Sequence, residues 1–222
     1  MSKFMRLMKP VAAMAVLMAA AGAAQASPST HTYGDIAAPG VFYGSGNVNG
    51  HFTIDTENGI ELALRAKNYG GALIDGSSGV YHSAPGLSAI GLAAGRNRAV
   101  WNFDYSINAT NAANDYIVRL GFDNDASAAT SYDYATFTVA SGSKFQDSLN
   151  IIFYPNGPYG PFNINTPGLY NFSLTAYAAG DTTYATALAS TEITVAVPEP
   201  ESMALMGLGL LGLALARRRR AK

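Results

Sequence analysis

The strongest constraint on the fold is a strict alternation of apolar and polar side chains over residues 101–108. Every second residue is large and apolar, and the residues between are polar: Trp101, Phe103, Tyr105 and Ile107 against Asn102, Asp104, Ser106 and Asn108. A period of two is that of a β-strand, whose successive side chains point to opposite faces. We therefore expect a strand with its apolar face toward a core and its polar face toward solvent.

The same pattern recurs along the chain, with turn residues between the segments. It predicts eight strands, within residues 52–55, 60–67, 101–108, 116–123, 132–139, 149–154, 169–178 and 189–197. Asn58-Gly59 is the preferred sequence of a type I′ hairpin turn. Residues 68–98 show no clear period, and we expect a long excursion there. Short strands without a convincing amphipathic helix predict an all-β fold, either an antiparallel β-sandwich or a jelly-roll-like arrangement.

The N-terminus has the three parts of a secretory signal peptide. Three Lys and Arg residues within the first nine positions precede the apolar run 11–24, and Ala24-Gln25-Ala26 follows as a small-x-small site. We expect a signal helix within residues 1–26, export by the Sec machinery and cleavage after Ala26. The alternative, a buried N-terminal helix, leaves the charges and the small-x-small site unexplained.

The C-terminus carries a second segment with three parts. They are the motif Pro198, Glu199 and Pro200, the 14-residue apolar run 203–216, and the cluster Arg217, Arg218, Arg219 and Arg220. As an α-helix the apolar run reaches about 21 Å, which is less than the roughly 30 Å hydrocarbon core of a membrane. Snorkelling arginines and local thinning can close this gap. We expect a transmembrane helix with its arginines on the cytoplasmic side.

These parts, in this order, resemble the PEP-CTERM protein-sorting signal of Gram-negative bacteria, with the resemblance covering residues 197–222 and the sorting segment itself taken as 198–222. In that family an exosortase, a membrane-embedded cysteine transpeptidase, recognises and removes the tail. The resemblance implies that Pro198, Glu199 and Pro200 are the recognition motif and that Arg217 to Arg220 are the stop and orientation signal. It also implies transient anchoring in the inner membrane, delivery to the cell surface or extracellular matrix, and an association with exopolysaccharide and biofilm formation. The same tail is also catalogued as an ice-binding protein C-terminal domain. A permanent tail anchor is the alternative.

Between the two ends, residues 27–197 form the expected extracytoplasmic β-sandwich domain. This part contains six Lys and Arg against thirteen Asp and Glu, a formal charge of −7, and it has no cysteine. Such an acidic surface does not attract nucleic acid, and the lack of cysteine excludes disulfides and thiolate metal sites. Segments such as 119–123 and 168–176 resemble uncharacterised β-rich bodies on other proteins with this tail. That resemblance implies a secreted architecture without a particular activity.

The histidines and serines do not predict an enzyme. His31, His51 and His82 lie in three separate segments, so no local pair offers a zinc site, and we expect surface or partly buried histidines. The sequence lacks the G-x-S-x-G elbow of serine hydrolases. Ser141 and Lys144 match S-x-x-K without its partner motifs, which indicates a turn.

The carboxylates give one weak metal candidate and no catalytic pair. Glu57 and Glu61 flank the predicted hairpin, where solvated charges are expected rather than the facing carboxylates of a glycosidase. Asp123, Asp125 and Asp133 lie near the end of a predicted strand and could supply oxygen ligands to calcium. The alternative is that they hydrogen-bond their own turn. We expect no cofactor, with calcium as the weaker possibility.

The remaining candidate is an aromatic loop. Tyr154, Tyr159 and Phe162 lie in a Pro- and Gly-rich stretch, and such rings can stack on sugars. The alternative is that they cap the end of the core. Thr136 and Thr138 form no repeated array of the kind that ice binding would need. We expect a non-catalytic structural or adhesive protein, with a secreted carbohydrate-binding module as the alternative.

Overall fold

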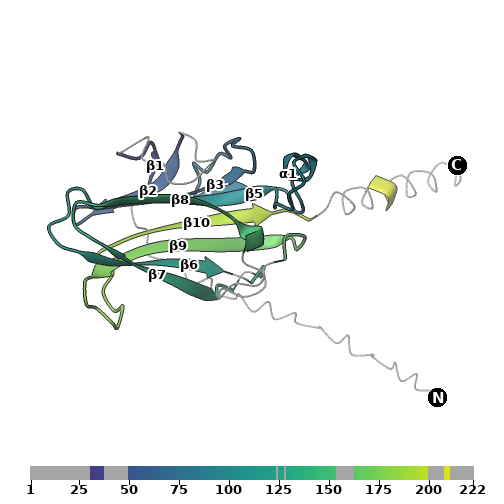
Figure 1. The fold of residues 1–222 in the computed structure, drawn as a ribbon. Coiled ribbons are helices and arrows are strands. Elements are labelled where there is room, and N and C mark those ends of the chain that lie inside the picture. The colour runs from purple at the N-terminus through teal and green to yellow at the C-terminus, as the bar shows by residue number, and fades with distance from the viewer. Residues whose placement is uncertain are drawn as a thin grey trace, which may run out of the picture.

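Two five-stranded sheets pack face to face in the computed structural model, which describes residues 31–37, 50–123, 125–127, 129–153, 163–199 and 208–210 (Figure 1). The first sheet contains, in spatial order, β1 (Thr32–Gly34), β2 (Phe52–Glu57), β3 (Ile60–Asn68), β5 (Trp101–Asn108) and β8 (Lys144–Asn150). The second sheet contains β4 (Val80–His82), β10 (Ala189–Val197), β9 (Gly168–Ala178), β6 (Tyr116–Asp123) and β7 (Tyr132–Val139). The short helices are α1 (Ala89–Ala93) and the 3-10 helix η1 (Ile151–Phe153). The chain is therefore an all-β sandwich.

The core lies between the inner faces of the two sheets. Phe172 of β9 stacks on Phe103 of β5 with ring centroids 4.6 Å apart, and it meets Trp101 edge to face at 5.8 Å. Phe122 of β6 joins the same group at 6.3 Å from Phe172. All four side chains are buried. These aromatic contacts tie the sheets together, as the apolar faces of the predicted strands require.

β10 joins the two sheets along one side of the sandwich. The backbone N–H of Ser190 donates to Asp55 Oδ2 at 2.7 Å, and Thr191 Oγ1 donates to the Thr53 carbonyl at 3.2 Å. Asp55 and Thr53 belong to β2 in the first sheet. The last strand is thus fixed to both layers by buried, satisfied polar groups.

The sequence pattern is correct for seven of the eight predicted strands, and the eighth, predicted at residues 149–154, has the wrong bounds. That strand is β8, which begins at Lys144 and ends at Asn150. The Asn150 side chain causes the early end, because its Oδ1 accepts the N–H groups of Ala99, at 2.9 Å, and Ile152, at 3.3 Å. A side chain that binds nearby backbone in this way competes with the sheet ladder.

The expected type I′ turn between β2 and β3 is confirmed, since Asn58 and Gly59 have φ values of 51° and 82°. The long excursion expected over 68–98 contains α1 and β4, neither of which the pattern predicted. β4 pairs with β10 in parallel, so the expected antiparallel pairing does not extend to this edge. β1 was also missed. β1 and β4 have three residues each, which is too short for a period to show.

The polar face of residues 101–108 does not face solvent, contrary to the sequence prediction. Asp104 is fully buried, and Asn102 and Ser106 are also buried. Asp104 Oδ2 accepts from Arg65 Nε at 2.7 Å and from Lys67 Nζ at 3.0 Å. Burial lowers the pKa of the Lys67 ammonium, and the neighbouring Asp104 carboxylate partly offsets this effect. Charges tolerate such burial because they are paired with one another.

The stability of the sandwich is expected to fall above about pH 10. Burial raises the pKa of Tyr81 to about 12, and its hydroxyl is hydrogen-bonded to Thr53 Oγ1 at 3.0 Å. The unfolded chain loses this proton near pH 10, whereas the folded protein keeps it. The contribution of the protonated Tyr81 hydroxyl to the free energy of unfolding is therefore complete below about pH 10. It is lost as the pH rises toward about 12, by up to ~1.4 kcal/mol per pH unit.

Urea unfolding of the wild type and of Tyr81→Phe between about pH 9 and about pH 11 measures this effect. The phenylalanine variant has no proton to lose at this position, so its stability should fall less steeply. Burial also raises the pKa of Tyr170 and Tyr177, but these tyrosines are present in both proteins. Equal slopes for the two proteins would show that Tyr81 titrates as in the unfolded chain.

Candidate functional site

The point at which the chain leaves the sandwich is fixed by β10. Val197, its last residue, is buried and pairs with Gly168 of β9. On the other side, Ala196 pairs with His82 of β4, and its carbonyl accepts the N–H of Ser83 at 3.0 Å. Regular structure therefore continues to residue 197, and the predicted motif begins at the next residue without a linker.

Pro198 and Glu199 lie at one side of a surface depression of about 400 Å³. Its lining comes from β4, from the start of β9 and from the end of β10: His82, Pro167, Gly168, Leu169, Ala196, Val197, Pro198 and Glu199. Leu169 is 42% exposed there. The first two motif residues are thus presented beside a partly apolar surface of the folded domain.

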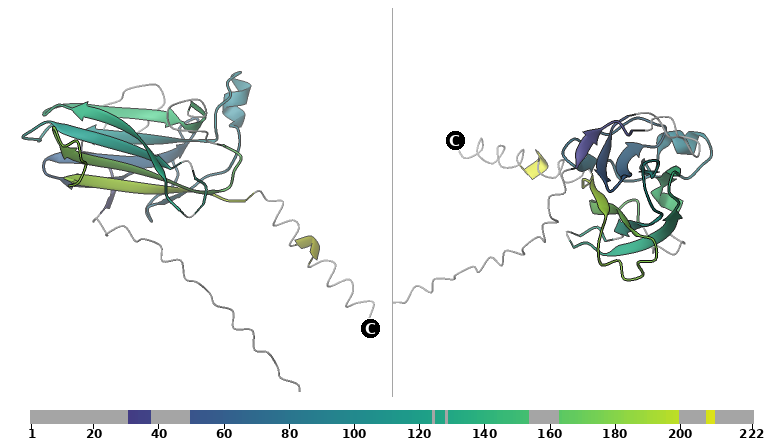
Figure 2. Two further views of the ribbon diagram at one scale, coloured as in Figure 1. Left: turned by 90° about the horizontal axis from the view of Figure 1, so that it is seen from below. Right: turned by 90° about the vertical axis from the view of Figure 1, so that its left-hand side faces the viewer.

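The same end of the sandwich exposes further apolar side chains. Figures 1 and 2 show α1 at the end where β10 finishes. Ile90 and Leu92 of this helix are 60% and 51% exposed, and Leu87 just before it is 39% exposed. We call this end, with Leu87, Ile90, Leu92 and Leu169, the exit end.

Most of the predicted sorting segments lie outside the described residues. This applies to Ala24 and Ala26, to Pro200, and to Arg217, Arg218, Arg219 and Arg220. Within the tail, residues 208–210 are helical, and Leu208 and Leu210 are exposed. Among the described residues, no helix has both the length and the apolar character needed to cross a membrane.

The outer face of the second sheet carries a cluster that the sequence analysis did not predict. Arg119 of β6 lies over the ring of Tyr134 of β7, with Cζ 3.6 Å from the ring centroid. It also lies 4.3 Å from the ring centroid of Tyr184, in the loop between β9 and β10. Tyr177 of β9 meets Tyr184 edge to face at 5.3 Å. We call Arg119, Tyr134, Tyr177 and Tyr184 the Arg119 cluster.

A second polar contact crosses the same face. Tyr132 of β7 donates its hydroxyl to Glu192 Oε1 of β10 at 2.8 Å, although two strands separate them. The Tyr132 side chain can reach Glu192 because the residues between them, Gly121 and Ser173, are small. A Cβ on Gly121 would already come within 3.1 Å of the Tyr132 ring. Burial, followed by the Glu192 carboxylate, raises the pKa of Tyr132.

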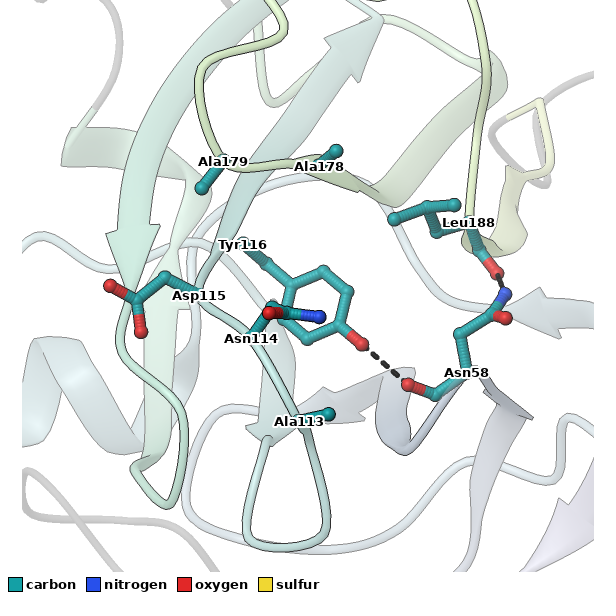
Figure 3. Close-up of a pocket in the computed structure, with 8 residues that line it drawn as sticks. All are labelled: Asn58, Ala113, Asn114, Asp115, Tyr116, Ala178, Ala179 and Leu188. Carbon is teal, nitrogen blue, oxygen red and sulfur yellow. Dashed lines mark hydrogen bonds between the residues drawn. The ribbon is translucent and has the colours of Figure 1, made fainter.

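A depression of about 440 Å³ lies at the end of the sandwich opposite the exit end (Figure 3). Its lining includes the β2–β3 turn, and Asn58 Nδ2 donates to the Leu188 carbonyl at 2.6 Å. Tyr116 donates its hydroxyl to the Asn58 carbonyl. Asp115 also lines it, but its Oδ1 accepts the backbone N–H of Ser141 at 2.9 Å. The polar groups that line the depression are thus hydrogen-bonded to the backbone of the surrounding turns. The depression therefore offers no pair of free acid and base groups.

The three histidines lie at the surface, as expected. His31, His51 and His82 are exposed on different segments. The turn expected at Ser141 is confirmed, since the N–H of Ser143 bonds to the carbonyl of Ala140 at 3.1 Å. The expectation that Glu61 is solvated is wrong: it is buried, and its two carboxylate oxygens accept the Ala37 N–H at 2.9 and 3.1 Å.

The aspartates of the weak calcium candidate brace a loop. Asp123 is buried, and its Oδ1 accepts the N–H groups of Asp125, at 3.1 Å, and Ser131, at 3.2 Å. Asn171 donates its amide to Asp123 Oδ2 at 3.2 Å. Asp133 is exposed at the start of β7. Within the described ranges, no three His, Asp or Glu side chains form a group able to hold a metal. Calcium binding stays a prediction.

The predicted aromatic loop lies outside the described residues, so a sugar site at Tyr154, Tyr159 and Phe162 also stays a prediction. The Arg119 cluster is the aromatic surface that the structure does describe. One signal for it was present in the sequence: Tyr132 and Tyr134 alternate with apolar Ala135 and Phe137, as Arg119 does with Leu120. The contribution of Tyr184 depends on how a loop folds, which alternation does not encode.

These features define a class of protein, a β-sandwich whose last strand continues directly into a C-terminal tail. Residues 196–220 match the family model described as the PEP-CTERM protein-sorting motif. The resemblance of the tail to this signal is therefore confirmed, and the match supports an exported protein that an exosortase sorts at the membrane. The matched region begins inside β10, at Ala196. No curated protein matches the sequence.

Proposed function

We propose that the Sec machinery exports this protein, that its C-terminal helix holds it transiently in the inner membrane, and that an exosortase then cleaves near Pro198-Glu199-Pro200. The product is the 27–197 sandwich, delivered to the cell surface or extracellular matrix. The observation that carries this proposal is the motif match that begins within the last strand of the fold. The exposed apolar side chains of the exit end suit a position close to the membrane before cleavage.

We further propose that the delivered domain has a structural or adhesive role and no catalytic one, with exopolysaccharide as its partner. The glutamates of the domain support a non-catalytic role. The Glu61 carboxylate accepts the Ala37 N–H, and the Glu192 carboxylate accepts the Tyr132 hydroxyl. Carboxylates held in this way are poorly suited to the acid and nucleophile roles that glycoside hydrolysis needs. The formal charge of −7 over residues 27–197 keeps such a domain soluble outside the cell.

Mass spectrometry of the protein purified from its producing cells tests the sorting proposal. We expect a mature chain that begins at Ser27 and lacks the apolar run and the arginine cluster. Replacing Pro198, Glu199 and Pro200 together with alanine should leave the tail in place, because the recognition motif is gone while the helix and arginines remain.

The matched control replaces Glu201 and Ser202 with alanine, two residues just outside the motif. Processing of this control should be unchanged. A wild-type chain that keeps its tail to Lys222 would overturn the proposal and leave a permanent membrane anchor. Equal processing of the motif variant and the wild type would show that the motif residues are not what the peptidase recognises.

A second candidate function is carbohydrate binding, which the Arg119 cluster favours. Tyrosine rings beside hydroxyl side chains are a common surface for sugar recognition, since sugar rings present both C–H faces and hydroxyl groups. Tyr134 is 42% exposed on this face, and the neighbouring outward residues include Thr136, Thr138 and Thr175.

A further inference from the structure

We propose that the Arg119 cluster binds the acidic sugar residues of a polysaccharide. This inference rests on the second candidate function above and specifies its ligand and its site. A sugar acid combines a ring whose C–H groups can stack on tyrosine with a carboxylate that can pair with a guanidinium. The cluster offers these two kinds of contact side by side on an open sheet face.

The state of Arg119 is the first argument. Within the part of the chain that the structure describes, its guanidinium makes no salt bridge, and its buried Nε has no hydrogen-bond partner. Its contacts are with the faces of Tyr134 and Tyr184. An arginine normally satisfies several of its five N–H donors. Stacking uses the face of the guanidinium, and its two terminal Nη groups, which unlike Nε are not buried, keep their in-plane donors for an anion.

The backbone at Tyr184 is the second argument. Its φ of 53° is in the left-handed region, which is unfavourable for a bulky residue. Asp181 Oδ1 holds this conformation by accepting the N–H groups of Thr183, at 2.8 Å, and Tyr184, at 2.9 Å. Glycine would adopt the same conformation without strain. The strained residue is instead a tyrosine, whose ring covers Arg119.

The surrounding side chains favour a sugar over a lipid surface. Arg119 pairs with Thr136 on one side and with Thr175 on the other, and the Thr175 hydroxyl is hydrogen-bonded to Ser190 Oγ at 2.9 Å. A membrane-binding face would expose large aliphatic side chains. Within the described ranges the only exposed large aliphatic side chain of this face is Leu169, which lies at the exit end, and Tyr134 is the exposed large hydrophobic residue of the cluster itself.

The negative charge of the domain favours a ligand that brings a single acidic group to the Arg119 cluster over a ligand that is densely charged along its length. Arg119 is one of six Lys and Arg residues in a domain with a formal charge of −7. A densely charged partner such as nucleic acid would be repelled by the remainder of the surface. A polysaccharide with carboxylates spaced along a mostly neutral chain avoids much of this repulsion, and we expect binding to weaken at high salt.

Binding to immobilised alginate, a polyuronate, tests the proposal, with dextran as the neutral comparison. The assay uses the protein purified from its producing cells, with or without its tail, so a failure of the sorting proposal does not affect it. We expect retention on alginate and not on dextran. Arg119→Gln should weaken binding on the order of tenfold or more, because it removes a charge-assisted contact.

Two further variants separate binding from folding. Tyr184→Gly removes the ring and relieves the left-handed strain, so it should weaken alginate binding without lowering the melting temperature. Arg96→Gln is the matched control, since it removes an exposed arginine that follows α1, at the exit end. Its binding should equal that of the wild type.

Three outcomes would overturn the proposal. They are the absence of alginate binding by folded wild-type protein at low salt, equal losses in the Arg96 and Arg119 variants, and binding to dextran that Arg119→Gln leaves intact. Retention on anionic phospholipid vesicles in place of alginate would likewise reject the sugar and indicate a membrane surface as the ligand.

Discussion

Replacing Asp104 with asparagine is expected to lower the free energy of unfolding by about 3–5 kcal/mol. The Asp104 carboxylate is fully buried between Arg65 and Lys67, each only 1% exposed. Asparagine preserves the size of the side chain but not its charge. Two buried cations would then face each other without this counter-charge, and their burial keeps bulk solvent from replacing it.

Urea unfolding of matched variants tests the role of charge at this site. Lys67→Met leaves the Arg65–Asp104 ion pair balanced, so its cost should be much smaller than that of Asp104→Asn. Asp35→Asn removes a carboxylate with a side chain that is 73% exposed, and the midpoint should stay unchanged. A loss of less than about 1 kcal/mol for Asp104→Asn, or a larger loss for Lys67→Met, would contradict this account.

Replacing Phe172 with alanine is expected to cost a similar amount, about 3–5 kcal/mol. Phe172 is 2% exposed and contacts Trp101 and Phe103 of the opposite sheet as well as Phe122 of its own. Removal of the ring loses its burial and leaves a cavity between the layers that the surrounding strands cannot close. This loss is a large part of the roughly 5–15 kcal/mol that stabilises a typical domain.

The shift of the urea midpoint at constant slope measures the cost. Phe172→Leu should recover most of the stability, because leucine fills much of the same volume. Phe145→Ala is the comparison at the sandwich edge, where the ring is 37% exposed, and its cost should be clearly smaller. Equal costs for the Phe145 and Phe172 variants would mean that the aromatic contacts between the sheets are not what holds the layers together.

The strands could be predicted because alternation is a local property. Residues 101–108 show one face that is apolar, and this face lies in the core as expected. The other face could not be predicted, since the burial of Asp104 depends on its register with Arg65 of β3. Arg65 and Asp104 are 39 residues apart in the chain, and no local pattern encodes their pairing.

The sorting tail and the proposed binding surface differ in the same way. The sorting tail is a linear signal, so the order of Pro198, Glu199, the apolar run and the arginines was enough to identify it. The Arg119 cluster depends on strand pairing and on a loop. Gly121, two residues from Arg119, pairs with Tyr134, and Tyr184 comes from the segment between β9 and β10. Only the outward directions of Arg119 and Tyr134 followed from the sequence.

The position of β10 also determines how the domain responds to a mechanical pull at its C-terminal end. The strand pairs at nine positions with β9 and at three with β4. Ladder hydrogen bonds lie across the strands, so a force along β10 loads many of them in shear at once instead of opening them one by one. A protein held at the cell surface by residues near 198 would therefore be pulled along a strand that resists extraction.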